Sequence, residues 1–330
     1  MSIEQMGSIK LNHIYQMDCI EGLKLIPDKS IGLVVIDPPY NINKASWDNI
    51  ENYIDWMGSI FKEIERVLKD KGSLYFFHND FLQVVDIQNW LKENTEFNFK
   101  QMITWNKINP DFKNYGYVQQ RLAINGMRNY YNGFTEYCFF YTLQKENVQT
   151  PFSKIIHAEM KKKGLREIDF RKLKTSKNGN PTGWCSNVML GKNIPTKQDW
   201  HLICSLIGEY DYEHLLKTYE NDRYPFNVAN VKQDLRANSN VWLYPPARNQ
   251  GHITAKPVEL VENIIFHSSN EGDVVLDCFM GSGTTAVAAL KNNRNFIGFE
   301  TEPKYIEIAN KRLEPSIMNR SQKAVRSVRV

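Results

Sequence analysis

Short apolar runs alternate with amphipathic segments through the first 150 residues, and this alternation restricts the fold more than any other feature of the sequence. The run from Leu33 to Ile36 contains no polar residue, which is typical of a strand covered on both faces of a parallel sheet. Over 53–69 the apolar side chains recur at intervals of three and four, which predicts an amphipathic helix. Further strands are expected at 74–77 and 137–141. The pattern predicts an α/β fold.

The alternation is lost between about residues 150 and 240, where Lys, Asn, Gly and Pro become more frequent. It returns after residue 250, with helices predicted over 257–267, 284–292 and 303–313 and strands over 274–276 and 296–299. The sequence therefore predicts one α/β domain formed by two separate segments, 1–150 and 241–330, with an irregular insert over 151–240 between them.

Composition excludes several classes of protein. The five cysteines form no C-x-x-C pair, which argues against a zinc site or a disulfide framework and favours a reducing compartment. No metal-binding pattern is visible in the sequence. No apolar run approaches the roughly 18 residues that span a bilayer, and the N-terminal residues lack the pattern of a signal peptide. We therefore expect a cytoplasmic protein with no membrane association.

The formal net charge of the 330 residues is only +4, but the charge is unevenly distributed. Residues 151–250 contain 16 Lys and Arg against 10 Asp and Glu. The densest cluster there supplies the candidate DNA-binding residues Lys161, Lys162, Lys163, Arg166, Arg171, Lys172 and Lys174. Such a cluster suits a phosphate backbone, although a solvated helix face has the same composition. Two weaker candidates are the basic and aromatic residues of 107–134 and the basic tail over 311–329.

A glycine-containing loop follows the predicted strand at 274–276 and leads into a helix. Gly281 and Gly283 permit a tight turn and a close approach to a ligand, and the helix N-terminus offers free N–H groups. The loop lacks the lysine of a P-loop and the third glycine of a dinucleotide site. Asp277 is suited to hold a cationic amine and Glu300 a ribose diol. These residues favour an amino-acid-bearing nucleoside over a purely structural turn.

Asp37-Pro38-Pro39-Tyr40 follows directly on the strand that ends at Ile36. The two prolines lack N–H donors and restrict the turn, so a carboxylate, carbonyls and an aromatic ring are held together. Such a group suits an exocyclic NH₂ on a flat heterocycle, with Asp37 and the Pro38 carbonyl accepting its hydrogens and Tyr40 stacking on the ring. The acceptors direct the nitrogen lone pair at an electrophile, which is catalysis by positioning. These four residues are the predicted catalytic residues; an ordinary strand-ending turn is the alternative.

The tetrapeptide 37–40 and the loop 277–283 together resemble the paired signatures of S-adenosylmethionine-dependent amino DNA methyltransferases. Their order, with the catalytic tetrapeptide early and the cofactor loop late, resembles the β-class of this family. The resemblance implies a Rossmann-like methyltransferase fold, with a mostly parallel, circularly permuted sheet and helices on both faces. It also implies that 1–150 is the catalytic half, 151–240 the inserted target-recognition segment and 241–330 the cofactor-binding half.

Weaker features agree with the resemblance. Met17-Asp18-Cys19 stands where the family places a carboxylate near the cofactor adenine. Residues 252–257 resemble the family's H-P-T-x-K-P stretch, although Ile253 and Ala255 depart from it, and 224–227 and 239–242 resemble the close of the target-recognition segment. The cofactor-binding residues implied by the resemblance are Asp18, Cys19, Asp37, His252, Thr254, Lys256, Pro257, Asp277, Phe279, Gly281, Ser282, Gly283, Thr284, Thr285 and Glu300.

The resemblance implies transfer of a methyl group from S-adenosylmethionine to adenine N6 of a base flipped out of duplex DNA. The family tends to place Asp before the prolines in adenine enzymes and Ser in cytosine enzymes, so Asp37 favours adenine and cytosine N4 is the alternative. A non-catalytic DNA-binding relative and a nicotinamide-dependent oxidoreductase are further alternatives, and the second leaves the tetrapeptide unexplained. By resemblance we expect a homodimer associated with the nucleoid. A separate cognate restriction endonuclease, as in restriction–modification, is left open.

Overall fold

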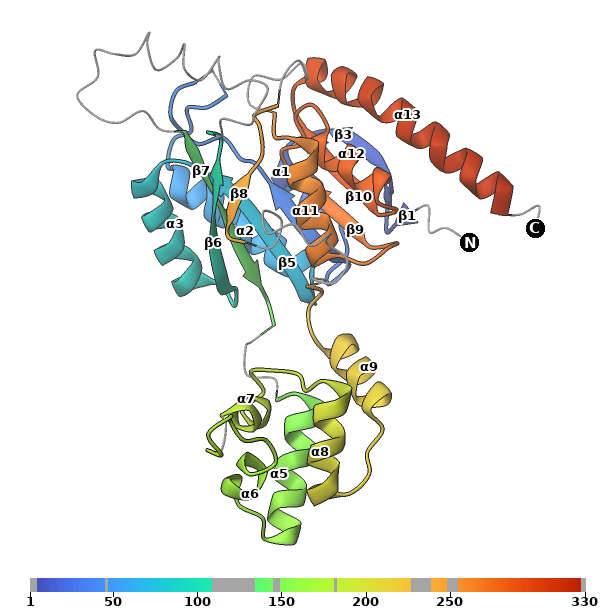
Figure 1. Cartoon of the computed structure of the whole chain (residues 1–330). Helices are drawn as coiled ribbons and strands as arrows, with labels where there is room; N and C mark the ends of the chain where they lie inside the picture. The colour runs from blue at the N-terminus through green and yellow to red at the C-terminus, as the bar shows by residue number, and fades with distance from the viewer. Residues whose placement is uncertain are drawn as a thin grey trace. The chain divides into compact units, whose positions relative to one another are not determined.

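The computed structural model describes residues 5–44, 47–108, 134–144, 149–180, 183–226, 239–247 and 255–327, with side chains as far as residue 317. The chain forms two compact units, Met1–Gln144 with Tyr224–Val330 and Lys145–Arg223 (Figure 1). The elements of the first unit are β1 (Gln5–Met6), β2 (Ile9–Lys10), β3 (His13–Gln16), α1 (Cys19–Lys24), β4 (Ile31–Ile36), α2 (Tyr53–Val67), β5 (Leu68–His78), α3 (Phe81–Asn94), β6 (Asn98–Asn106), β7 (Thr135–Thr142), β8 (Val241–Leu243), α11 (Val258–Ser268), β9 (Val274–Asp277), α12 (Thr284–Lys291), β10 (Asn295–Glu300) and α13 (Pro303–Ser327). The elements of the second unit are α5 (Pro151–Lys163), α6 (Glu167–Arg171), α7 (Trp184–Met189), α8 (Lys197–Ile207) and α9 (Tyr212–Asp222).

An eight-stranded sheet in the order β3-β10-β9-β4-β5-β7-β6-β8 forms the centre of the first unit. Neighbouring strands are parallel except that β7 is antiparallel to both β5 and β6. The late strands β9 and β10 lie between the early strands β3 and β4, as a permuted order requires. The predicted α/β class with a mostly parallel sheet is therefore confirmed.

Alternate side chains of β4 are buried on opposite faces of the sheet, which explains why every residue from Leu33 to Ile36 is apolar. Val34 and Ile36 belong to a core that also contains buried side chains of α1, α2 and α3. Leu33 and Val35 belong to the opposite core, which is shared with α11, α12 and α13. Both faces of the strand are buried, so helices cover both faces of the sheet as expected.

The neighbouring strands β4 and β9 are followed by helices on opposite faces of the sheet. The chain leaves β4 toward α2 in one core, whereas it leaves β9 toward α12 in the other. Where connections diverge in this way, a crevice opens beyond the carboxyl ends of the strands, and ligands of open α/β sheets bind there. Asp37 follows β4 and Asp277 ends β9, so this topology brings the two predicted motifs to one crevice.

The second unit is helical, so the prediction of an irregular insert is wrong. Phe152 and Ile156 of α5 pack with Trp200, Ile203 and Ile207 of α8 in a separate core. These apolar residues are spaced at helical intervals, but the many polar residues between them obscure the pattern. The unit also ends at Arg223, earlier than the predicted boundary at 240, and Tyr224 and Phe226 pack against a core of the first unit.

Candidate active site

A cavity lies in the crevice beyond the carboxyl ends of β4 and β9, within the first unit. Segments from both predicted motifs line it, together with side chains that follow β10 and precede α11. Its lining residues are Val35, Ile36, Asp37, Pro38, Pro39, Tyr40, Lys44, Trp47, Asp48, Phe77, Glu136, Ala255, Lys256, Val261, Asp277, Phe279, Met280, Gly281, Ser282, Thr284, Thr285, Glu300, Thr301, Glu302 and Tyr305.

Asp37 is engaged on both carboxylate oxygens. The Tyr40 hydroxyl donates to Oδ1 at 2.7 Å, and the Lys256 ammonium lies 2.5 Å from Oδ2. The Lys256 side chain is 6% exposed and the Asp37 side chain 24%. Burial lowers the pKa of Lys256, but Asp37 and Glu136 outweigh burial and raise it above the ordinary value. Lys256 was predicted to contact a cofactor; the structure places its charged end on the predicted catalytic carboxylate.

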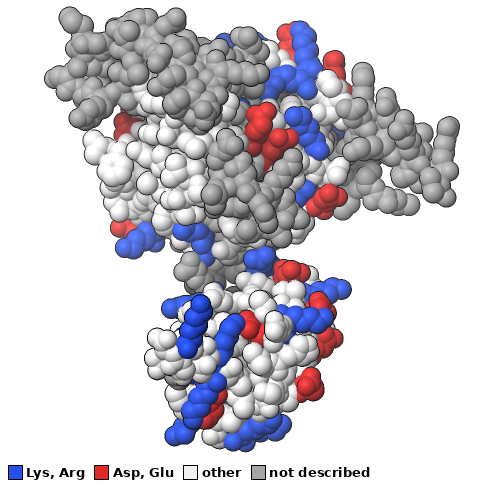
Figure 2. All heavy atoms as spheres, viewed as in Figure 1, with Lys and Arg blue, Asp and Glu red and all other residues white. Residues whose placement is uncertain are grey.

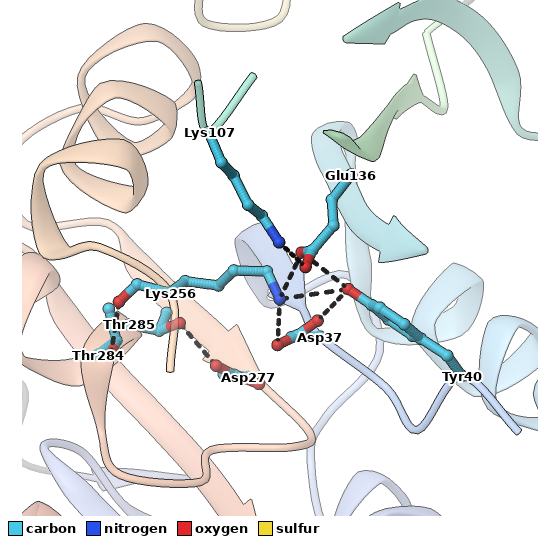
Figure 3. Close-up of polar contacts among 8 residues, drawn as sticks. All are labelled: Asp37, Tyr40, Lys107, Glu136, Lys256, Asp277, Thr284 and Thr285. Carbon is cyan, nitrogen blue, oxygen red and sulfur yellow. Dashed lines mark hydrogen bonds and ion pairs between the residues drawn. The ribbon is translucent and has the colours of Figure 1, made fainter. Parts of the chain in front are cut away.

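Glu136 lies on the other side of the same ammonium, with Oε2 at 3.2 Å from Lys256 Nζ. Lys107 donates to the other oxygen of Glu136 (Figure 3). Burial opposes ionisation of Glu136, but the two lysines prevail and lower its pKa to about 2. The four charged groups form a neutral, largely buried cluster, which is the arrangement that buried charges require.

The antiparallel direction of β7 explains how Glu136 reaches this site. Parallel strands bring their carboxyl ends to the crevice, whereas β7 brings its first residues there. Glu136 is the second residue of β7 and pairs with Trp105 near the end of β6, two residues before Lys107.

Hydrogen bonds from neighbouring elements fix the backbone of the tetrapeptide 37–40, the predicted catalytic residues. The Tyr53 hydroxyl donates to the Pro39 carbonyl at 2.7 Å, and Gln83 Nε2 donates to the Tyr40 carbonyl at 3.0 Å. The backbone N–H of Asp80 donates to His78 Nδ1, so Nε2 carries the proton and faces the Tyr53 oxygen at 3.0 Å. Burial lowers the pKa of His78 to about 4, which keeps this supporting ring neutral.

A buried carboxylate also shapes the loop after the tetrapeptide. Asp48 is 1% exposed and accepts backbone hydrogen bonds from Asn41 at 2.7 Å and from Lys44 at 2.9 Å. Asn41 has a positive φ of 54°, a conformation that Asn tolerates in tight turns. The folded loop places Lys44 and Trp47 on the cavity wall.

Asp277, at the end of β9, also lines the cavity and is 4% exposed. Its Oδ2 accepts from the Thr285 hydroxyl at 2.6 Å and its Oδ1 from the Phe279 backbone N–H at 2.9 Å. Burial raises the pKa of Asp277 to about 7, although both hydrogen bonds lower it. A cation at this wall is therefore the natural partner for the ionised form.

Glu300 closes the glycine loop from the end of β10. Its Oε2 accepts from the Gly281 backbone N–H at 2.7 Å, and its Oε1 from the Glu302 backbone N–H at 2.9 Å. Gly283 has a φ of +82° and lies under α13, where an added Cβ would stand 2.8 Å from the Ala309 Cβ. The glycine is needed both for its dihedral angle and for its size.

Most predicted site residues line the cavity, and a few do not. The cavity lining includes the four predicted catalytic residues. It also includes the predicted cofactor residues Lys256, Asp277, Phe279, Gly281, Ser282, Thr284, Thr285 and Glu300. Gly283 and Pro257 are not among the lining residues; they are the N-caps of α12 and α11. Asp18 and Cys19 are not among the lining residues: Asp18 caps α1 through the Ile20 N–H and Cys19 is buried in the core, and their contact with a cofactor stays a prediction. His252 and Thr254 lie outside the described residues.

Glu136, Lys107 and Asp48 were not predicted from the sequence. Glu136 carries one visible signal, since it is an acidic residue at the start of the otherwise aromatic and apolar strand TEYCFFYT. Lys107 belongs to the predicted basic and aromatic region 107–134, of which residues 109–133 lie outside the described part of the chain.

The predicted DNA-binding residues are distributed over α5, α6 and the segments beside them in the second unit. Figure 2 shows Lys and Arg side chains gathered on the side of this unit that carries α6 and α7. Several have acidic partners nearby: Lys162 lies 3.4 Å from Glu159, and Lys174 lies 3.0 Å from Asp199. Lys161 and Lys172 are exposed and take part in no ion pair within the described residues. In the C-terminal tail, Arg312 donates to the Ser282 carbonyl at 2.6 Å, and the basic side chains beyond residue 317 are not described.

The described residues contain neither a metal-ligand cluster nor a membrane-spanning helix. No group of three or more His, Cys, Asp and Glu side chains in this part of the chain is placed to hold a metal ion. Nor does any described helix combine the length and apolar character needed to cross a membrane.

Comparisons with known proteins agree with this geometry. A family model for N6/N4 DNA methylases matches residues 31–311. The type II methyltransferase M1.MboII of Moraxella bovis is 31% identical over 316 residues, covering 92% of this chain and 96% of that protein. The DNA adenine methyltransferase YhdJ of Escherichia coli K12 is 28% identical over 316 residues, covering 90% and 81%.

A solved structure shares the fold. The M1.HpyAVI–SAM complex superposes with a TM-score of 0.51 at 21% identity, covering 91% of this chain and 98% of that one. Since the family model spans most of the chain and a relative above 30% identity is aligned along nearly its full length, the chain belongs to the N6/N4 DNA methylase family.

Proposed function

We propose that this DNA methylase is a β-class enzyme that transfers a methyl group from S-adenosylmethionine to adenine N6 in duplex DNA. One observation carries the proposal: Asp37, which follows β4, and Asp277, which ends the neighbouring strand β9, line a single cavity. A methyl donor on the Asp277 side and an amine on the Asp37 side would meet between them.

The cavity residues fit S-adenosylmethionine on the Asp277 side. Asp277 is a buried carboxylate with an elevated pKa, so it gains from an ammonium such as the one on the methionine portion. Glu300 lies at the end of the next strand, where a ribose diol is held in related nucleoside sites. Gly281 adds no side chain, so the ligand can approach the backbone closely. Phe279 and Tyr305 supply apolar surface for the adenine ring.

When bound, S-adenosylmethionine would supply an electrophilic methyl group on a sulfonium whose sulfur takes the electron pair of the C–S bond; the amine nitrogen would form the new N–C bond and lose one proton to solvent. Asp37 orients the nitrogen by accepting one of its hydrogens. The Pro38 carbonyl is the proposed acceptor of the other, and the hydrogen bonds from Tyr53 to the Pro39 carbonyl and from Gln83 to the Tyr40 carbonyl fix the backbone beside it. The contribution of these residues is positioning and preorganised acceptors rather than a strong base.

The choice of adenine rests on the acid before the two prolines. Asp37 is the residue that the family tends to carry in adenine enzymes, and the relative YhdJ is named as an adenine methyltransferase. Cytosine N4 presents the same amine chemistry and is the second candidate. Either base must leave the duplex to reach a cavity this deep, at a cost of a few kcal/mol.

The second unit is proposed as the DNA-reading segment. Its exposed lysines and arginines suit phosphates, which set the position of a protein on the duplex, while other side chains read base edges. The unit also has its own core, so it can present such side chains on a rigid surface.

Mass spectrometry of nucleosides tests the proposal. Plasmid DNA from a strain without DNA methylases is incubated with the protein and S-adenosylmethionine carrying a deuterated methyl group, then digested. Deuterated N6-methyladenine is expected. Deuterated N4-methylcytosine without N6-methyladenine would replace the adenine assignment with the cytosine one.

A further inference from the structure

The Lys256 ammonium is shared between two carboxylates. It lies 2.5 Å from Asp37 and 3.2 Å from Glu136 (Figure 3). Three aromatic rings also face it, with ring centres at 5.0 Å for Phe77, 5.5 Å for Tyr40 and 6.0 Å for Trp105. Such rings stabilise a cation without fixing it to one acceptor. The ammonium can therefore shift between its two partners while it stays charged.

The contact with Asp37 conflicts with the role of that carboxylate in orienting an amine. Oδ2 has an ammonium as its closest partner, and Oδ1 already accepts from Tyr40. A carboxylate that is neutralised by a cation is a weaker acceptor for an incoming amine hydrogen. The cation must move away from Asp37 when the amine arrives, and a buried cation needs another acceptor within reach.

We propose that Glu136 is a positioning residue that holds Lys256 while the target amine occupies Asp37. The inference rests on the proposed function, and it involves no bond to carbon and no proton transfer, because the proton remains on Lys256 Nζ throughout. Lys107 holds the other oxygen of Glu136 and so keeps Oε2 directed at Lys256. Both lysines also favour the ionised form of Glu136, whose pKa they lower to about 2 against the effect of burial.

Methyl-transfer kinetics of three variants test this role: Glu136→Gln, Lys256→Met and the double variant that combines them. Glu136→Gln keeps the shape of the side chain but removes the charge that attracts Lys256, so the ammonium stays on Asp37. We expect kcat to fall about 10- to 100-fold, the range seen when groups that orient functional side chains are removed, with the Kd for S-adenosylmethionine unchanged. In the Glu136→Gln/Lys256→Met double variant the cation is absent from Asp37, and kcat should be at least that of Glu136→Gln alone.

Glu262→Gln is the matched control, because Glu262 also pairs with a lysine, Lys291 at 3.8 Å, but lies on α11 away from the cavity lining. Thermal unfolding establishes that each variant folds. If Glu136→Gln does not fold, the same comparison is made with Glu136→Asp, whose shorter side chain weakens the pull on Lys256.

Two results would overturn the inference. One is a Glu136 variant with the wild-type kcat. The other is a double variant whose fold-loss in kcat equals the product of the fold-losses of Glu136→Gln alone and Lys256→Met alone. Failure of the proposed function is seen separately, as wild-type protein that leaves no methylated adenine in the DNA.

Discussion

The Lys256 ammonium lies 2.5 Å from Asp37 Oδ2, an ion pair between residues 219 positions apart in the chain. The pair joins the segment before α11 to the segment after β4, and it lies on the wall of the cavity that the two motifs share. It places a positive charge beside the carboxylate on which the proposed reaction depends.

Replacing Asp37 should separate catalysis from binding. Asp37→Ala removes the acceptor that orients the amine, so we expect methyl transfer to fall at least about 1,000-fold, near the upper range for loss of one preorganised group. DNA binding, measured by mobility shift, should persist because the second unit is unchanged. Asp70→Ala is the control, since Asp70 is an exposed acid paired only with Lys29 on the surface. An Asp37→Ala protein that methylates at the wild-type rate would contradict the mechanism.

Asp277 should make stability depend on pH. Its pKa is about 7 in the folded chain against an ordinary 3.8, so the folded state binds more protons than the unfolded state between these values. Stability should therefore fall as pH rises from about 4 to 7. Asp277→Asn has no ionisable group there and does not lose this stability. Its stability relative to wild type should therefore be about 2 to 3 kcal/mol greater at pH 8 than at pH 5. Urea unfolding at both pH values measures the difference; an equal difference at both would rule out the elevated pKa.

Two glycines with the same backbone dihedral separate steric clash from strain. Gly283 and Gly272 have φ of +82° and +85°, but only Gly283 has an atom, the Ala309 Cβ, within 3 Å of an added Cβ. Gly272→Ala should cost about 1 kcal/mol from strain alone, and Gly283→Ala about 2 to 4 kcal/mol because the glycine loop and α13 must also move apart. Gly283→Ala should also weaken S-adenosylmethionine binding, as measured by calorimetry. Equal losses of stability would show that packing against Ala309 is unimportant.

Exposed lysines of the second unit should contribute to DNA affinity by neutralising phosphates. Lys161→Ala/Lys172→Ala should weaken binding of duplexes of any sequence and reduce the slope of log K against log salt by about 1 for each phosphate that is no longer neutralised. Lys197→Ala is the control, because Lys197 is exposed in the same unit but pairs with Glu213 at 2.8 Å. Fluorescence anisotropy over a range of salt concentrations measures both quantities. Identical slopes for the double variant and wild type would remove these lysines from the interface.

The sequence predicted the elements that set the site, because local patterns determine them. A continuous apolar run marks β4 and β9, and the residues that end such strands in a parallel sheet meet at one edge. The sequence placed Asp37 and Asp277 at the ends of two predicted strands, and the resemblance to amino DNA methyltransferases linked the two motifs. The helical insert was missed because its apolar positions are diluted by Lys, Asn and Gly.

The charge cluster could not be predicted in the same way. Glu136 reaches the site only because β7 runs against its neighbours, and the apolar pattern of a strand does not reveal its direction. The contact between Lys256 and Asp37 depends on the register of the sheet and on the path of the chain before α11. The helix-capping role of Asp18 was also not predicted: its carboxylate caps α1, and its contact with a cofactor stays a prediction.

Single-molecule sequencing of plasmid DNA methylated in vitro tests the central claim most directly, because it reports the modified base and its sequence context together. Wild-type protein with S-adenosylmethionine should leave N6-methyladenine at one short sequence, and the Asp37→Ala protein should leave none. Modified cytosine in place of adenine, or the same adenine signal from both proteins, would contradict the account of a site centred on Asp37.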